Sequence, residues 1–157
     1  MADCKVIVAG AGPAGLAAAA LLAKEGLATT VVAPAAGEDP RTVALMQPSI
    51  QLLRYLDIWP GKLESETSPL RKLRIIDDTG SLLVTPNLEF ASQDLNLEAF
   101  GWNVPLALLL PVLRRRAEDL GVTFVEATAT GAVSRDGAIH VTLSNSTEIS
   151  AALCLAA

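Results

Sequence analysis

Three glycines near the amino terminus have the spacing of a phosphate-binding loop. Gly10, Gly12 and Gly15 form the pattern Gly-x-Gly-x-x-Gly. In such a loop the first glycine allows a tight turn, the second lets the backbone approach a pyrophosphate, and the third lets a helix pack closely on the preceding strand. The free amides and positive dipole end of that helix then face the phosphates. We therefore predict a dinucleotide site built from Gly10, Ala11, Gly12, Pro13, Ala14 and Gly15.

The elements that must position this loop flank it in the sequence. Residues 5–9 predict a β-branched strand buried on both faces, and residues 28–33 predict a second strand. Between them, residues 14–25 predict an alanine- and leucine-rich helix that stops at a glycine. Residues 6–23 also form an uncharged run long enough for a membrane span, and a signal peptide is another alternative. Glycines and a proline inside the run disfavour one uninterrupted helix.

The second strand lacks the acidic residue that usually follows this loop. An Asp or Glu that binds the ribose hydroxyls is expected about 20 residues on, but Ala33 occupies the place and Pro34 follows. Glu38 and Asp39 lie a few residues further and could substitute. Acidic residues in a loop of this composition are more often simply solvated, so both interpretations stay open.

The length, composition and charge of the chain limit the classes of protein to which it can belong. The chain has 157 residues, which fits one domain with an adequate core. Hydrophobic residues make up 51% and the net charge is −5, which offers no attraction for nucleic acid. Cys4 and Cys154 form neither a metal-ligand spacing nor a disulfide framework, so a reducing setting is expected. The apolar run over residues 151–157 stops with the chain, whereas domains seldom end in mid-strand.

The rest of the chain predicts a mixed α/β fold. A hairpin is expected from strands over residues 70–76 and 81–85, joined by an Asp/Gly-containing turn. A helix over residues 106–120 leads to a third parallel strand over residues 122–125. Three more strands are then expected to form a β-meander, over residues 130–135, 138–143 and 148–156.

Two further segments, taken with the glycine loop, resemble a known enzyme family. A loop reads Asp39-Pro-Arg-Thr-Val-Ala-Leu-Met, and a predicted helix over residues 48–56 leads into Leu-Asp-Ile-Trp. Residues 98–105 read Glu-Ala-Phe-Gly-Trp-Asn-Val-Pro. In this order the motifs resemble the amino-terminal portion of the FAD-dependent aromatic hydroxylases of ubiquinone biosynthesis, which are para-hydroxybenzoate hydroxylase-like class A flavoprotein monooxygenases.

The resemblance implies cofactors and site residues. In this family NADH or NADPH reduces bound FAD, and the flavin then hydroxylates a phenol or related ring. It implies that Arg41, with Thr42 beside it, contacts the flavin nucleotide, that the backbone of Thr130 meets the adenine, and that Ala33 stands at the ribose position. No catalytic residue and no metal ligand is predicted. Trp102 either faces the substrate or, as is commoner for such a residue, packs in the core.

The resemblance also implies how the chain is divided. Residues 1–65 and 104–157 correspond to a Rossmann-like FAD-binding domain, truncated before the family's Asp-Gly motif. Residues 66–103 correspond to a partial substrate-domain hairpin on an antiparallel sheet. Leu106 and Ala107 depart from the family, which has Asn followed by Arg or Ala there. A piece of this kind is expected to be inactive alone.

The expected partners follow from the same comparison. They are FAD, an aromatic substrate that could be a polyprenylated phenol, and either a second copy or a complementing carboxyl-terminal chain. The expected location is cytoplasmic, with peripheral association at the inner face of a membrane. Two other hypotheses remain: a non-catalytic nucleotide-binding or interaction module derived from this fold, and, less favoured, an NAD-dependent dehydrogenase.

Overall fold

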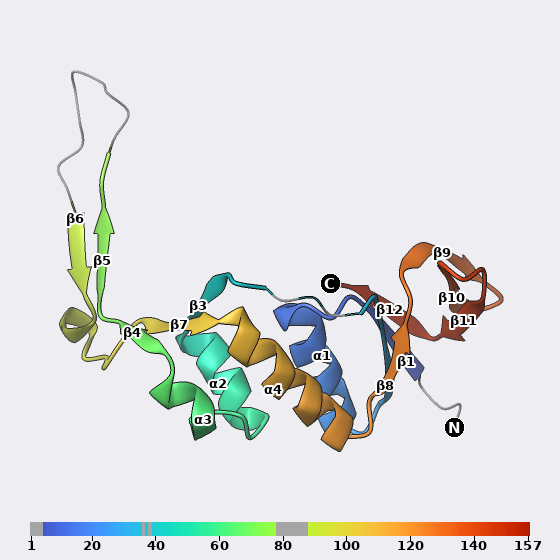
Figure 1. The fold of residues 1–157 in the computed structure, drawn as a ribbon, viewed down its shortest axis with the longest axis horizontal. Coiled ribbons are helices and arrows are strands. Elements are labelled where there is room, and N and C mark those ends of the chain that lie inside the picture. The colour runs from blue at the N-terminus through green and yellow to red at the C-terminus, as the bar shows by residue number, and fades with distance from the viewer. Residues whose placement is uncertain (1–4, 36, 38, 78–87) are drawn as a thin grey trace.

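A four-stranded parallel sheet carries the glycine loop. The structure is a computed structural model that describes residues 5–35, 37, 39–77 and 88–157. The sheet has the order β12-β1-β2-β8, with every pairing parallel (Figure 1). Its strands are β1 (Lys5–Ala9), β2 (Ala28–Ala33), β8 (Thr123–Glu126) and β12 (Leu153–Ala156). This arrangement confirms the predicted α/β fold with a parallel sheet.

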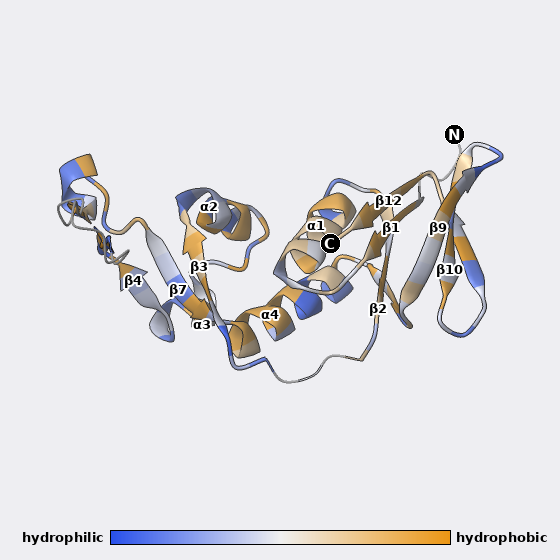
Figure 2. Ribbon diagram, turned by 90° about the horizontal axis from the view of Figure 1, so that it is seen from above, coloured by the Kyte–Doolittle hydropathy of each residue, from blue (hydrophilic) through white to orange (hydrophobic). Residues whose placement is uncertain are grey.

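Two helices cover one face of this sheet. α1 (Pro13–Lys24) begins with a proline at a position where a missing N–H costs no helical hydrogen bond. α4 (Leu106–Asp119) packs beside it, and both contribute to the larger hydrophobic core (Figure 2). The uncharged run over residues 6–23 is therefore a strand and a helix, as predicted. None of the helices in the described part of the chain is long and apolar enough to cross a membrane.

A β-meander covers the opposite face. It consists of β9 (Ala129–Arg135), β10 (Ala138–Leu143) and β11 (Glu148–Ala151), paired antiparallel. Alternating residues of the parallel strands divide between the two faces: Val8 and Val31 pack with the helices, whereas Ile7 and Val32 pack with the meander. This alternation is the two-residue period of a strand with both faces buried.

The prediction of one strand over residues 148–156 is wrong. A bend at Ala152 separates β11 from β12, and β12 leaves the meander to pair with β1. The edge of β1 offers unpaired backbone groups on the side away from β2, and β12 satisfies them.

A second, antiparallel sheet has the order β3-β7-β4. It comprises β3 (Thr42–Met46), β4 (Ser68–Leu70) and β7 (Gly101–Pro105), with α2 (Gln47–Tyr55) and α3 (Gly61–Ser65) beside it. The segment predicted as a loop carrying the Arg-Thr motif is thus mostly strand β3. Gly101 is required here, because a Cβ on it would lie 2.2 Å from the carbonyl oxygen of Leu45.

A two-stranded ribbon projects from the body (Figure 1). It pairs β5 (Lys72–Ile75) with β6 (Leu88–Ala91), and a 3-10 turn (Ser92–Leu95) follows. A hairpin is confirmed, but its return strand among the described residues is β6. The predicted return strand over 81–85 and most of its turn lie outside the described residues. We call β5 and β6 the arm.

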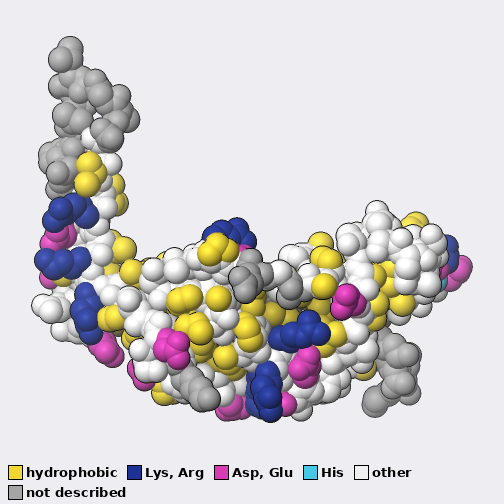
Figure 3. Space-filling view, viewed as in Figure 1, with side chains coloured by type: hydrophobic (Ala, Val, Ile, Leu, Met, Phe, Trp, Pro, Cys, Tyr) yellow, Lys and Arg dark blue, Asp and Glu magenta, His cyan; other side chains and the backbone are white. Residues whose placement is uncertain are grey.

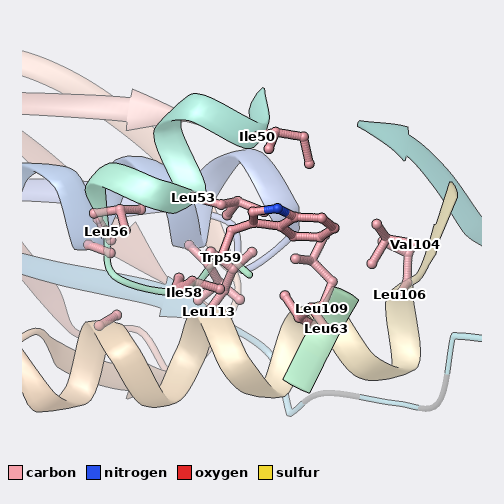
Figure 4. Close-up of a cluster of buried hydrophobic side chains, with 14 of the residues drawn as sticks. Ile50, Leu53, Leu56, Ile58, Trp59, Leu63, Val104, Leu106, Leu109 and Leu113 are labelled. Atoms are coloured by element: carbon pink, nitrogen blue, oxygen red, sulfur yellow. The ribbon is translucent and has the colours of Figure 1, made fainter. Parts of the chain in front are cut away.

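The larger core lies between α1, α2, α4 and the sheets (Figure 4). Leu109 and Leu113 of α4 are each 1% exposed, and Ile50 and Leu56 are fully buried. Trp102 packs edge-on against Trp59 with ring centroids 5.2 Å apart. At 5% exposure Trp102 is a core residue, which was the commoner of its two predicted roles.

Candidate functional site

The three glycines of the loop differ in why a side chain is absent at each position. Gly10 has a φ of +123°, and a Cβ on it would lie 1.8 Å from the carbonyl oxygen of Ala157. A Cβ on Gly15 would lie 2.3 Å from the carbonyl oxygen of Gly10. A Cβ on Gly12, in contrast, would meet nothing within 4 Å. The chain itself therefore needs Gly10 and Gly15, whereas the missing side chain of Gly12 leaves space for a ligand.

The start of α1 presents unsatisfied backbone donors beside that space. Gly12 is the N-cap residue and supplies no side-chain cap, while its carbonyl accepts a hydrogen bond from the Leu16 N–H at 2.9 Å. Pro13 has no N–H to offer, so the amides of Ala14 and Gly15 are the first donors of the helix. Such amides, at the positive end of the helix dipole, attract phosphate oxygens.

A groove of about 770 Å³ runs from this helix start along α4. That volume lies within the usual range of roughly 300–1,000 Å³ for small-molecule sites. Three segments line it: the start of α1 (Ala11, Leu16), the loop after β2 (Gly37, Asp39, Pro40) and one side of α4 (Leu106, Ala107, Leu110, Pro111, Arg114). The groove is mostly apolar, with few polar groups, as ligand sites generally are.

Asp39 and Arg41 form a forked ion pair in the loop wall. Arg41 Nε and a terminal guanidinium nitrogen donate to the two carboxylate oxygens at 2.8 and 2.6 Å. The Arg41 backbone N–H donates to the same carboxylate at 3.1 Å. The side-chain hydrogen bond from Arg41 is the main reason that the pKa of Asp39 falls to about 2, and the pair raises the pKa of Arg41.

The α4 wall contains one unusual residue. Pro111 lies inside the helix and cannot donate to the carbonyl of Ala107, four residues earlier. Both residues line the groove. Arg114 stands at the end of this wall, where its Nε donates to Glu118 at 2.9 Å and its guanidinium carbon lies 4.3 Å from the centroid of the Phe124 ring.

The structure brings together only part of the predicted site. The loop over residues 10–15 reaches one end of the groove through Ala11. Ala33 lies at the end of β2, where its carbonyl accepts a hydrogen bond from the Ala127 N–H at 3.1 Å. Of the ten predicted site residues, Ala11 alone is among the described residues that line the groove; the others, Gly10, Gly12, Pro13, Ala14, Gly15, Ala33, Arg41, Thr42 and Thr130, are not. The side chain of Arg41 is joined to the groove lining through Asp39, and its carbonyl accepts a hydrogen bond from the N–H of Leu106, another lining residue, at 2.9 Å.

Thr42 and Thr130 belong to different sheets. Thr42 begins β3 and pairs with Pro105. Thr130 lies in β9, and its hydroxyl donates to the carbonyl of Thr142 at 3.1 Å. Glu38, the other acidic candidate of the loop, lies outside the described residues.

Sequence reasoning missed the α4 wall as part of the site. The resemblance placed Leu106 and Ala107 in a region that approaches the flavin in several family members, but they were noted as departures from the family pattern and were not counted among the site residues. The available signal was the spacing of Ala107 and Pro111, which places them on one side of the helix.

Several solved protein structures are similar to this chain. No curated protein matches the chain. Solved structures do, among them the Diels-Alderase PyrE3 of pyrroindomycin biosynthesis, with a TM-score of 0.73 and 22% identity over 99% of this chain and 32% of that one. The OxyS anhydrotetracycline hydroxylase from Streptomyces rimosus gives 0.75 and 20%, over 98% and 31%. A flavin-dependent halogenase from Xanthomonas campestris, Xcc4156, gives 0.78 and 16%, over 97% and 41%.

These similarities show a shared fold, and the chain spans about a third of the length of those structures. The sequence itself matches a family model described as an FAD binding domain. The match extends over residues 3–151, nearly the whole chain, and the chain therefore belongs to this family of FAD-binding domains.

Proposed function

We propose that this chain binds FAD in the groove and is the FAD-binding portion of an NAD(P)H-dependent monooxygenase that hydroxylates an aromatic ring. The observation that carries the proposal is the open space at the Cβ position of Gly12, beside the uncapped amides of α1 and next in the chain to Ala11, which lines the groove. A pyrophosphate needs both a close backbone approach and unsatisfied donors.

The residues present fit this cofactor. Gly12 permits the approach, Ala14 and Gly15 supply amides to the phosphates, and the apolar side of α4 excludes water from one side of the ligand. Bound FAD would supply the redox chemistry, and the chain's residues would bind and orient it. Arg41 is proposed as a further nucleotide contact, held in position by Asp39.

The narrower parts of the proposal rest on the motif resemblance. It supports an aromatic substrate, a role in ubiquinone biosynthesis, and a cytoplasmic location peripheral to a membrane. It also supports a division into an FAD-binding part, residues 1–65 and 104–157, and a substrate-domain part, residues 66–103. Sheet β3-β7-β4 draws strands from both parts, so we propose that they form one packed unit.

The test is binding of FAD by the purified chain and by a Gly12→Val variant. Saturation at 100 times the dissociation constant stabilises a protein by about 2.7 kcal/mol. For a chain of this size that corresponds to a rise of about 5–11 °C in Tm. Gly12→Val should abolish the shift and the flavin absorbance while folding normally, because its Cβ enters open space.

Ala28→Val is the matched control. Ala28 is exposed at the other end of β2, so the substitution adds bulk far from the loop. It should leave the FAD-dependent shift unchanged. An equal shift in the wild type and in Gly12→Val would place the nucleotide elsewhere, and no shift in the wild type would refute FAD binding by this chain.

A non-catalytic nucleotide-binding module is the second candidate. The absence of a carboxylate at Ala33 and the apolar residues exposed on the arm favour it. FAD-loaded protein that fails to oxidise NADH or NADPH, even when supplied with a complementing carboxyl-terminal chain, would support this alternative.

A further inference from the structure

The ribose of a bound nucleotide needs a hydrogen-bond acceptor that the end of β2 does not provide. In sites of this type a carboxylate at the end of the second strand accepts from the ribose hydroxyls. Ala33 stands there, and its carbonyl already accepts the Ala127 N–H at 3.1 Å. Another group must accept from the ribose if it is to be held.

Asp39 is the acidic residue that the structure brings to the groove. Among the described residues that line it, Asp39 is the sole carboxylate. Its side chain is 21% exposed, whereas that of its partner Arg41 is 77% exposed. The loop therefore turns the carboxylate inward and the guanidinium outward, the reverse of what simple solvation of the acidic residue would give.

The carboxylate is fixed in orientation and still has acceptor capacity. One oxygen accepts from the backbone N–H and from Nε of Arg41, and the other accepts from a terminal guanidinium nitrogen. A carboxylate offers about four lone-pair sites. One site on the second oxygen thus remains for a donor from a ligand.

Charge determines which part of a nucleotide suits this position. A carboxylate repels phosphate, so the phosphates belong at the start of α1, where the helix dipole is positive. Sugar hydroxyls are neutral donors that match a carboxylate. Ala107 also lines the groove, and its carbonyl lacks the helical donor that Pro111 cannot supply. The pairing with Arg41 offsets the charge of Asp39, so an anionic ligand can lie nearby.

We propose that Asp39 binds the ribose hydroxyls of the adenosine half of FAD, so that the loop after β2 supplies the carboxylate that the end of β2 lacks. This inference rests on the proposed function, because it assumes that FAD lies in the groove. It assigns to Asp39 a direct ligand contact in addition to holding Arg41.

The experiment compares ADP with 2′,3′-dideoxy-ADP as probes, by calorimetry on the wild type and on Asp39→Ala. The lost hydrogen bond to a charged group should weaken ADP binding about ten- to a hundredfold. The dideoxy probe should bind both proteins equally, because it has no hydroxyl to lose. Glu89→Ala is the matched control. Glu89 also accepts two hydrogen bonds from an arginine side chain and has a pKa lowered to about 2, but it lies on the arm.

Each other outcome overturns the inference. Equal losses for both probes would mean that Asp39 acts only through Arg41 or the phosphates. If Asp39→Ala lost as much affinity for FMN as for ADP, Asp39 would contact the ribityl chain and not the ribose. If the wild type binds FAD, and Asp39→Ala binds ADP as tightly as the wild type does, only this inference fails. If the wild type binds neither FAD nor ADP, the proposed function fails with it.

Discussion

Helix α4 and the arm are both amphipathic, but α4 buries its apolar face whereas the arm exposes its own. Leu109 and Leu113 of α4 are 1% exposed. On the arm, Leu73 pairs with Phe90 and Ile75 with Leu88, and Ile75 and Phe90 are 59% and 48% exposed. The other face of the arm is charged: Arg74 and Lys72 both bind Glu89, at 2.8 and 2.9 Å (Figure 3).

The buried apolar side chains of the body stabilise the fold, whereas the exposed ones of the arm contribute little to stability. Burial of a large aliphatic side chain contributes roughly 1.5–3 kcal/mol, and an exposed one contributes little of that. A two-stranded ribbon is marginally stable by itself in water. The body therefore determines the free energy of unfolding, whereas the arm presents an apolar surface that the described residues leave uncovered.

The largest expected effect is on the body. Leu113→Ala should lower the free energy of unfolding by about 2–5 kcal/mol, because it leaves a cavity between α4 and the sheets. Urea denaturation followed by far-UV circular dichroism measures this. A cost below that of an arm substitution would show that the core between the helices is not the stabilising region.

The glycine loop should give the next largest effect. Gly10→Ala places a side chain at φ +123° and 1.8 Å from Ala157, so a loss of about 1–3 kcal/mol is expected. Gly12→Ala should cost much less, since its Cβ meets open space. Equal losses of stability in the two variants would contradict the distinct reasons given for these glycines.

Acid should destabilise the chain through the ion-paired carboxylates of Asp39 and Glu89. Hydrogen bonds from Arg41 and from Lys72 lower the pKa of Asp39 and Glu89, respectively, to about 2. Because unfolded Asp and Glu titrate near pH 4, both contributions are present above about pH 4 and are lost as the pH falls toward 2. Thermal melts of an Asp39→Asn, Glu89→Gln double variant should show a flatter dependence over this window, and an unchanged slope would exclude these pairs as its source.

The smallest expected effect on stability comes from the arm. Phe90→Ser should change the free energy of unfolding by no more than about 0.5 kcal/mol, as exposed substitutions generally do. It should nevertheless reduce the fluorescence of a bound apolar dye, because it removes exposed aromatic surface. A loss of stability comparable with that of Leu113→Ala would show that the arm packs against the body in solution.

Local sequence patterns predicted the strand, loop and helix at the start of the chain. The glycine spacing, the β-branched run before it and the glycine at residue 26 specified β1, the loop and α1 closely. The hairpin of the arm was predicted from its Asp/Gly turn signal, but the pairing of β5 with β6 was not, and the predicted return strand over residues 81–85 lies outside the described residues. A turn signal indicates where a chain can reverse, and pairing depends on which later segment matches the apolar face.

The candidate site also combines features that local sequence predicts with features that depend on tertiary packing. The glycine loop could be located from the sequence because its spacing, between a β-branched run and a helix start, is a local signal. The inward orientation of Asp39 could not, because an acidic residue in a Pro/Gly/Ala loop gives the same pattern whether it faces water or a groove. Strand β12 was hidden because residues 148–156 form one nearly apolar run, and the bend at Ala152 depends on the vacant edge of β1.

The position of β12 has a consequence for the order of assembly. Val6 pairs with Leu153, and Ala157 lies against Gly10, so the first strand and the last segment meet across almost the whole sequence. During synthesis, β1, α1 and β2 can associate early, since their contacts are local, whereas contacts at high sequence separation form late. The parallel sheet is therefore complete only after β12 has been synthesised, and a nascent chain lacking β12 would expose one edge of β1.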